Sequence, residues 1–549
     1  MNETRKQTLP GMEKAGWAKA LVMALCPLLF AILACALQGK TIADVYIPAS
    51  EWNDELFYYK LTENVVKFGF PQGYFGFNES HGIYLSFAAW SPMLLLPWVI
   101  WGKLLGWNLL SPVLCNLFLM MSTMFLIGRL LRPTWKQVAA IVIPFGVYSQ
   151  MTRFTLSGMP EVAHWCLMLL IVGLFISYIR EEKTWKLVVS IALIVLLTWM
   201  RPYFILLFFF PFLYLIRKDK RHILTLFAVL GLTGGVYYWI NHYLSAPYLT
   251  DLFYTDWIKA FGERGLGGGI LFMLHRLWDS FLFIARMAIQ CVLTGYASGG
   301  LYLGFLIIGL LLLIAFVREC KRAIEDHKQT TNKEDASTKK ELSASSSWVV
   351  LLLQLLLCFA GFFAAILLMY RLQEGGRHVI AFVAAGILVL AMREYDRVSY
   401  LVRTGLIILS FAFLYIVRAN SPYDFQIPFR TAELQEEIED LQGQMREEMK
   451  LSLDAVPNFD NTIVWVIWDN VGEGRVTVKW QQFYAVPQGF GINLCYDEYV
   501  IGQGEELQSR YIGTIPGGNV DHYLAQQGKR VIAQNKDLIV YDRYEEAGR

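Results

Sequence analysis

The sequence predicts a polytopic α-helical membrane protein with about 11 spans, interfacial helices and a small extracytoplasmic α/β domain at the C-terminal end. Of the 549 residues, 55% are hydrophobic and only 17% are charged, and the mean hydropathy is +0.40. That composition is too apolar for an ordinary soluble domain. Apolar runs of spanning length alternate with basic clusters up to residue 417, and the chain after residue 418 is polar.

The N-terminal end of the chain is expected in the cytoplasm. The first apolar run, 17–37, is long enough to span a bilayer and lacks a convincing small-residue cleavage site, so it is not a cleavable signal peptide. Arg5, Lys6, Lys14 and Lys19 precede it. Basic residues collect on the cytoplasmic side of membrane proteins, so this run should lead outward.

The same rule orients the other apolar runs. Two of them, 83–105 and 277–294, contain prolines or charged residues and are expected to lie in the outer interface, because only then do most basic loops stay inside. The remaining spans are expected at 110–131, 138–148, 162–179, 187–200, 203–216, 223–240, 301–317, 348–370, 379–392 and 401–417. The prediction is a multi-pass protein of the plasma membrane.

These spans divide the chain into three parts. Residues 1–300 form a first membrane module, which includes a long external segment, 241–298, with a glycine-rich run predicted as a flexible loop. Residues 301–418 add the last spans and a polar loop near 318–347, which is expected to be cytoplasmic and flexible. Residues 419–549 form the external α/β domain, with a helix at 431–453, strands at 462–468 and 538–541, and a helix at 522–533.

Charge and cysteine usage exclude several classes of protein. A net charge of +2 does not suggest nucleic acid as a partner. Most of the eight cysteines lie in apolar runs, and their spacing matches neither a disulfide framework nor a clustered metal site. No internal repeat is evident, which weighs against an inverted-repeat transporter.

The most informative stretch follows the first span and reads Trp52-Asn53-Asp54-Glu55, with Tyr58 and Tyr59 after it. Acids placed so close to hydrocarbon are costly unless they are solvated or functional. On a helix, Trp52, Glu55 and Tyr59 would share one face, and Asp54 and Tyr58 another. The alternative is a solvated amphipathic turn at the lipid headgroups, which this stretch alone leaves open.

Further polar residues gather at other external corners. A second corner carries Arg153, Glu161 and His164, and Arg201 stands at a third. The fourth holds Arg371, Arg377 and His378. A single arginine there could be a snorkelling anchor, and Glu161 could simply favour the N-terminal end of a helix. Basic residues are scarce on the outer side, however, so a cluster of them is informative.

Together these motifs resemble the GT-C class of integral-membrane glycosyltransferases, and most closely bacterial relatives of protein O-mannosyltransferases and aminoarabinose transferases. The likeness covers about residues 15–300. It includes the Asp54-Glu55 stretch, Met159-Pro160-Glu161 at the place of the family's second acidic motif, and Arg201-Pro202. The last spans and the tail match no one subfamily.

The resemblance implies transfer of a sugar from a polyprenyl-phosphate donor to a cell-envelope acceptor, with inversion, at the outer face of the lipid bilayer. Asp54 would be the catalytic base, helped by Glu55 and Glu161, because transfer needs a carboxylate beside the acceptor hydroxyl. Cations that would hold the departing phosphate are Arg201, Arg371, Arg377 and His378. Sugar or acceptor contacts are expected from Trp52, Tyr58, Tyr59 and His164. Some family members bind a divalent metal through such acids, but too few ligands are found here to predict one, and no other cofactor is expected.

Two other classes remain as alternatives. A transporter or flippase of lipid-linked glycans would place charges at mid-membrane within broken helices, whereas here they collect at external corners. A membrane scaffold whose tail binds cell-wall partners would leave the carboxylates and arginines unexplained.

Overall fold

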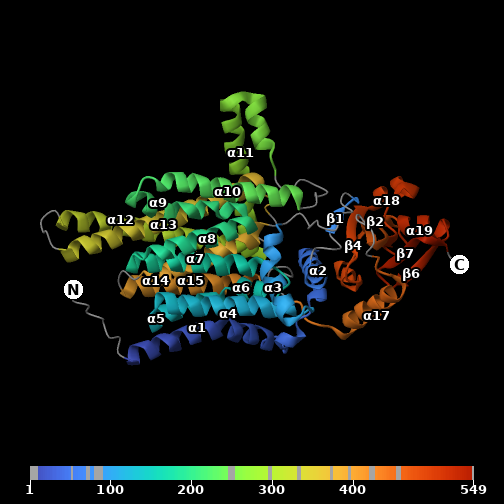
Figure 1. Ribbon diagram of the computed structural model, residues 1–549, viewed down its shortest axis with the longest axis horizontal. Helices are drawn as coiled ribbons and strands as arrows, with labels where there is room; N and C mark the ends of the chain where they lie inside the picture. Colours follow the sequence, from blue (N-terminus) through green and yellow to red (C-terminus); the bar gives the residue numbers. More distant parts are fainter. Residues whose placement is uncertain are drawn as a thin grey trace.

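The computed structural model confirms a polytopic helical protein with a mixed β-sheet domain at its C-terminal end (Figure 1). It describes residues 10–50, 53–69, 75–79, 91–244, 254–294, 300–330, 336–370, 372, 375–393, 397–418, 427–452 and 459–546. In this part of the chain, eight helices are long and apolar enough to cross a membrane. The protein is therefore a multi-pass membrane protein.

The eight long helices pack side by side with shorter ones. The long helices are α1 (Pro10–Ala36), α4 (Ser111–Leu131), α7 (Glu161–Glu181), α10 (His222–Tyr243), α11 (Asp256–Thr294), α12 (Gly300–Thr330), α13 (Ala336–Met369) and α15 (Arg397–Arg418). The shorter ones are α3 (Leu96–Leu105), α5 (Trp135–Val147), α6 (Ser149–Thr155), α8 (Thr184–Met200), α9 (Phe209–Lys218) and α14 (Ile380–Met392). Short 3-10 segments precede three of them: η3 (Pro92–Leu95), η4 (Pro202–Phe208) and η5 (Gly375–Val379).

The middle of the bundle is formed by α7 and α14. The apolar stretch of α7 is 89% buried, and every residue of α14 is buried. Small residues permit close approach of backbones where lipid provides no hydrophobic driving force between helices. At the contact of α1 with α4, a Cβ on Gly128 would stand 2.7 Å from the Cα atom of Ala20, so glycine is needed there.

Two segments predicted as flexible loops are helical. The glycine-rich run lies inside α11, where Gly265 alone leaves helical geometry, with φ of +67°. A Cβ on Gly269 would lie 2.5 Å from the Phe261 ring, so the two halves of α11 pack tightly. Figure 1 shows α11 projecting from the bundle at a steep angle to the other long helices. The run 277–294 is thus part of one long kinked element.

The segment near 318–347 was expected to be a flexible loop, but its described residues are helical. The helix α12 continues to Thr330 and α13 already begins at Ala336. Lys and Glu recur after residue 317 and are good helix formers, so the charges that suggest a solvated loop are equally compatible with helices.

The C-terminal domain is built on a seven-stranded sheet with the order β1-β4-β2-β5-β7-β6, and β3 pairs with β2 at the side. Strands β1, β4, β2 and β5 run parallel to one another, whereas β7 pairs antiparallel with β5 and β6, and β3 pairs antiparallel with β2. The strands are β2 (Thr462–Val471), β3 (Gly474–Thr477), β4 (Gly491–Tyr496), β5 (Tyr511–Thr514), β6 (Lys529–Gln534) and β7 (Ile539–Glu546). The domain's helices are α17 (Ala432–Glu448), α18 (Asp497–Gln503) and α19 (Asn519–Gln526), with short 3-10 turns η6 (Phe459–Asn461), η7 (Trp480–Ala485) and η8 (Gly504–Glu506).

Two expectations for this domain need correction. The predicted helix at 522–533 ends at Gln526, because Gly528 takes a φ of +68° and β6 follows. The sheet is also not confined to 419–549, since strand β1 (Phe75–Phe77) comes from the segment after the first span and pairs with β4. Lone strands cannot satisfy their backbone groups, so this segment and the tail form one unit.

Helix α2 (Asn53–Phe68) lies between the membrane helices and the sheet domain (Figure 1). The buried Lys60 donates from Nζ to the carbonyl oxygen of Val486 at 2.7 Å, and Asn64 Oδ1 accepts from the backbone N–H of Gly489 at 2.9 Å. Burying these polar groups is tolerable only because they are hydrogen-bonded. The contacts therefore fix α2 against the C-terminal domain.

Candidate active site

The first turn of α2 places two acids inside the protein. Asp54 is 7% exposed and Glu55 is fully buried. The N-terminal end of a helix favours negative charge, but burial at this level requires nearby cations or a bound ligand as well.

Arg377 supplies that cation to Asp54. Its Nη2 atom lies 2.5 Å from Oδ2 of Asp54, and its Nε atom lies 3.4 Å from Oε1 of Glu161. The same Glu161 oxygen is 3.7 Å from Nη2 of Arg201. We call Asp54, Glu161, Arg201 and Arg377 the acid–arginine cluster. Its members come from α2, the start of α7, the residue between α8 and η4, and η5.

Local sequence explains why these side chains meet. Pro202 cannot continue α8, so this helix ends at Met200, as the sequence predicts. Arg201 follows this end and lies near Glu161. Glu161 is the first residue of α7, directly after Pro160. Both residues are thus fixed at helix ends, which are rigid supports for a site.

Much of the hydrogen-bonding capacity in the cluster is unused. Both carboxylate oxygens of Glu161 and the Nε and Nη2 atoms of Arg201 are buried and make no hydrogen bond to any residue that the structure describes. The same holds for Nε2 of His164. Buried polar groups are nearly always satisfied by protein, water or ligand. The cluster is therefore suited to receive a polar, charged ligand.

Glu55 forms a second, separate pair. Its Oε1 atom lies 3.8 Å from Nη1 of Arg153 on α6, and Gly158 packs against it so closely that a Cβ there would stand 3.1 Å from the Cβ atom of Glu55. Burial raises the pKa of the Glu55 carboxyl, and the charge of Arg153 opposes this only in part. Glu55 is thus enclosed by protein, whereas Asp54 keeps slight access to solvent.

Rings line the cluster. Tyr58, His164 and His378 all lie close enough to Arg201 and Arg377 to experience their charges. The hydroxyl of Tyr370 is 3.2 Å from Nε2 of His378. His378 directly follows Arg377 in η5, so its ring and that of Tyr370 lie next to the cluster.

Most predicted site residues are brought together by the structure. Seven of them lie in or beside the cluster: Asp54, Tyr58, Glu161, His164, Arg201, Arg377 and His378. Glu55 directly follows Asp54 in the sequence. Trp52 and Arg371 lie outside the described residues. Tyr59 instead faces the C-terminal domain, where its ring is 5.4 Å from that of Tyr484.

Three residues near the site had no predicted role. Arg153 stood at the predicted second corner, and its spacing from Glu161 could have suggested a shared turn. Tyr203 and Tyr370 lie in apolar runs next to Arg201 and Arg371, and nothing distinguished them from interfacial tyrosines.

A divalent metal does not fit the cluster as it stands. No group of three or more His, Cys, Asp or Glu side chains arranged for a metal occurs among the residues that the structure describes. Asp54 and Glu161 are instead bridged by the guanidinium of Arg377. We therefore derive no step through a metal ion.

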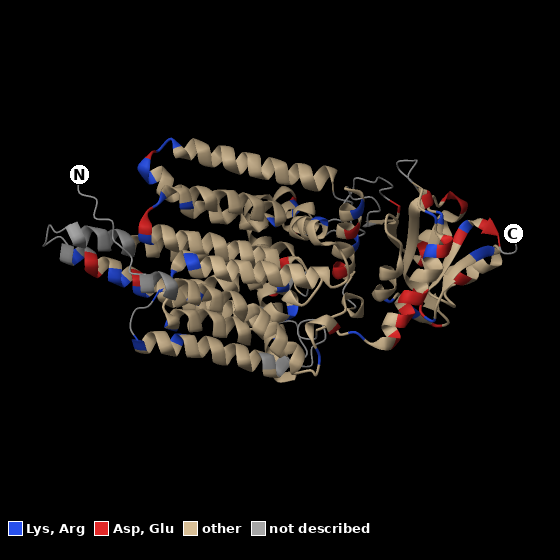
Figure 2. Cartoon of the chain, turned by 60° about the horizontal axis from the view of Figure 1, so that its bottom comes forward, with Lys and Arg blue, Asp and Glu red and all other residues tan. Residues whose placement is uncertain are grey.

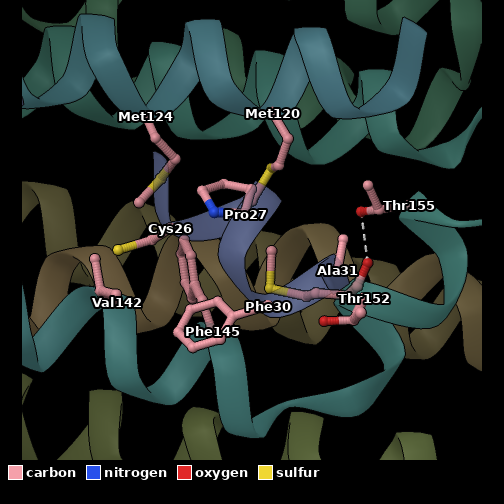
Figure 3. Close-up of a pocket in the computed structure, with 11 residues that line it drawn as sticks. Cys26, Pro27, Phe30, Ala31, Met120, Met124, Val142, Phe145, Thr152 and Thr155 are labelled. Atoms are coloured by element: carbon pink, nitrogen blue, oxygen red, sulfur yellow. Dashed lines mark hydrogen bonds between the residues drawn. The ribbon is translucent and has the colours of Figure 1, made fainter. Parts of the chain in front are cut away.

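A small pocket lies among α1, α4, α5 and α6, and no residue of the acid–arginine cluster lines it (Figure 3). It has a volume of only about 20 Å³, room for about one water molecule. Its lining is apolar apart from a cysteine and two threonines, and the Thr155 hydroxyl already donates to the Met151 carbonyl at 2.6 Å (Figure 3). The pocket has no group suited to acid–base chemistry.

No known sequence family and no curated protein matches this chain. Solved structures do resemble it. The oligosaccharyltransferase of Archaeoglobus fulgidus in the apo form matches with a TM-score of 0.49 and 12% identity, covering 94% of this chain and 73% of that chain. The same protein in complex with Zn and sulfate matches with a TM-score of 0.46 and 13% identity, over 95% and 73% of the two chains. ArnT from Cupriavidus metallidurans bound to undecaprenyl phosphate matches with a TM-score of 0.40 and 10% identity, over 96% and 98%.

These proteins are membrane glycosyltransferases of the GT-C class, which is the class that the sequence resembles. With TM-scores below 0.5 and identities of at most 13%, the likeness concerns the overall path of the chain. No role of a residue is taken from it.

Proposed function

We propose that this protein is a glycosyltransferase that moves a sugar from a polyprenyl-phosphate donor to a cell-envelope acceptor outside the plasma membrane. One observation carries the proposal: two carboxylates and two guanidinium groups meet in a buried cluster whose hydrogen-bonding capacity is partly unused. A sugar phosphate needs both kinds of group, a base for the acceptor and cations for the phosphate.

The proposed chemistry is a single displacement. Asp54 accepts the proton of the acceptor hydroxyl while that oxygen forms a bond to the anomeric carbon, and the bond from this carbon to the phosphate oxygen breaks. The polyprenyl phosphate leaves with the bonding electron pair, and Arg201 and Arg377 stabilise its charge. Attack opposite to the leaving group inverts the anomeric carbon. Glu161 holds both guanidinium groups in position through the contacts described above.

The site is proposed to face the outside of the cell. In Figure 2, Lys and Arg mark the ends of the helices that point away from the C-terminal domain, and acidic residues gather on that domain. An example is the basic group at the end of α9 and just before α10, which consists of Arg217, Lys218, Lys220 and Arg221. Because basic ends stay in the cytoplasm, α2, the acid–arginine cluster and the C-terminal domain would be extracytoplasmic. A polyprenyl-linked donor fits this side, where nucleotide sugars are absent.

The test is sugar transfer in membranes from a panel of radiolabelled polyprenyl-phosphate sugars, with the expression of each variant checked. We expect Asp54→Asn to lower turnover by about 10²- to 10⁴-fold, which is typical for loss of general-base catalysis, with donor binding retained. Glu55→Gln should be milder, because Glu55 is enclosed and paired with Arg153. Full activity of Asp54→Asn would refute the assignment of the base.

A transporter or flippase of lipid-linked glycans is the second candidate. It is favoured if Asp54→Asn, Glu55→Gln and Glu161→Gln all transfer sugar normally, or if no donor in the panel is consumed while a lipid-linked glycan crosses the membrane in vesicles.

A further inference from the structure

A polar cleft of about 440 Å³ separates α17 of the C-terminal domain from α2 and the segment before it. Its volume falls in the range of small-molecule sites. Residues of three distant parts of the chain line it, among them Tyr46, Tyr59, Trp107, Glu439, Arg446 and Tyr484. The cleft lies on the side of α2 that Tyr59 faces, away from the acid–arginine cluster.

Aromatic rings form one wall of the cleft. The ring of Tyr59 is 5.4 Å from that of Trp107, at an angle of 30°, and 5.4 Å from that of Tyr484. Tyr59 is only 5% exposed and is packed between these two rings, whereas Trp107 is half-buried and is the more accessible ring of this wall. Two polar atoms on this wall have no partner: the Tyr484 hydroxyl and Nε1 of Trp107 are buried and make no hydrogen bond to any described residue. Tyr484 is only 4% exposed.

The opposite wall is hydrophilic. It presents Gln435, Glu439, Gln442 and Arg446 from one face of α17, and Arg430 lies 5.7 Å from the ring of Tyr46. Donors and acceptors therefore alternate across from an aromatic wall, with charges of both signs. This combination suits a ligand with apolar ring faces and many hydroxyl groups. An acyl chain would leave most of these polar groups unpaired.

We propose that this cleft binds an oligosaccharide, which is the acceptor of the transfer reaction or the part of the acceptor next to the reacting hydroxyl. The role as acceptor rests on the proposed function, but the binding of a glycan does not. Tyr59 stands five residues after Asp54 on α2, and at about 1.5 Å of rise per residue the cleft lies within the length of a few sugars of the acid–arginine cluster.

The first experiment measures binding with the full-length protein in detergent and no donor. The probes are an array of soluble oligosaccharides, neutral, amino-substituted and uronic, printed beside short peptides. We expect at least one oligosaccharide to be retained. Tyr484→Phe and Glu439→Gln should each weaken it by about 2- to 10-fold, the effect of one lost hydrogen bond. Glu436→Gln is the matched control, since Glu436 is exposed on α17 and does not line the cleft, and it should bind as the wild type.

Three results would overturn the proposal. They are retention of no oligosaccharide, retention of peptides alone, or wild-type affinity for the oligosaccharide in both Tyr484→Phe and Glu439→Gln. The second experiment separates it from the proposed function. If transfer is observed, the cleft variants should raise KM for the acceptor with little change in kcat, and an unchanged KM would refute the cleft as acceptor site while the glycosyltransferase stands. If an oligosaccharide binds in the cleft but no donor is turned over, the binding site stands and the proposed function fails.

Discussion

The pairing of Asp54 with Arg377 allows the energetics of the cluster to be tested apart from its chemistry. Arg377 is 5% exposed and contacts Asp54 at 2.5 Å and Glu161 at 3.4 Å. Arg377→Met keeps much of the length of the side chain but removes its charge. Asp54 then has no ion pair among those found in the described part of the chain, whereas Glu161 keeps Arg201 at 3.7 Å. Breaking a buried pair on one side costs about 3–5 kcal/mol.

The double variant distinguishes this explanation from a simple loss of packing. Asp54→Asn alone leaves Arg377 close to Glu161, and we expect a loss of about 1.5–3 kcal/mol, as for a hydrogen bond to a charged group. In the double variant, Arg377→Met with Asp54→Asn, both charges of the pair are removed, so neither is left buried without its partner. The double variant should therefore be more stable than the sum of the single losses predicts, with a coupling of about 0.5–3 kcal/mol.

The relative stabilities of the single and double variants are compared by thermal unfolding of the purified proteins in one detergent. Unfolding midpoints are ranked and not converted to free energies, because membrane proteins of this size seldom unfold reversibly. Arg276→Met is a suitable comparison, since its partner Asp256 is half-exposed and such pairs contribute about 0–1 kcal/mol. Strictly additive losses in the double variant would refute the claim that these charges depend on each other. All variants lacking Arg377 should fail to transfer sugar even where stability is regained.

Three further predictions follow from individual residues. Burial raises the pKa of Glu55 above its ordinary value, so the wild type should gain stability relative to Glu55→Gln as pH falls through that raised pKa toward the ordinary one. Unfolding midpoints at several pH values would show it, and a constant difference would contradict it. Lys60→Met removes the bond from α2 to the C-terminal domain and should speed amide exchange in η7, measured by mass spectrometry; unchanged exchange would mean that this bond does not hold α2. In a background without native cysteines, an impermeant thiol reagent should label the exposed positions Thr41→Cys and Gln526→Cys in intact cells but not Lys220→Cys, and the reverse pattern would invert the topology.

The spans could be predicted because their signal is local. Long apolar runs and basic ends suffice to place helices such as α4, α7 and α13. Where the prediction failed, two local readings competed. The charged residues after 317 suit both a solvated loop and a helix that leaves the membrane, and the glycines around Gly265 suit both a flexible loop and a tight reversal between packed helices.

The site was predictable only in part, for a different reason. The side of the membrane on which Asp54, Glu161, Arg201 and Arg377 lie follows from topology. Which acid meets which arginine depends on helix packing that no local pattern encodes. The β1 strand is the extreme case, because its three residues pair with β4 across more than half of the chain. Such long-range pairing has no local sequence signal.

The geometry of the cluster also bears on the order of binding. With Arg377 at 2.5 Å, the carboxylate of Asp54 is engaged by the cation that we propose to bind the donor phosphate. The phosphodiester of the proposed donor offers two non-bridging oxygens to guanidinium groups and is well placed to compete for Arg377. Donor binding would then free Asp54 at the moment when an acceptor hydroxyl needs a base. In the absence of donor, the same pair keeps the base occupied and disfavours activation of water or acceptor without a sugar to receive it. Donor-first kinetics, in which acceptor alone does not bind productively near Asp54, is the consequence. Random-order kinetics in initial-rate experiments would show that the pair opens without the donor.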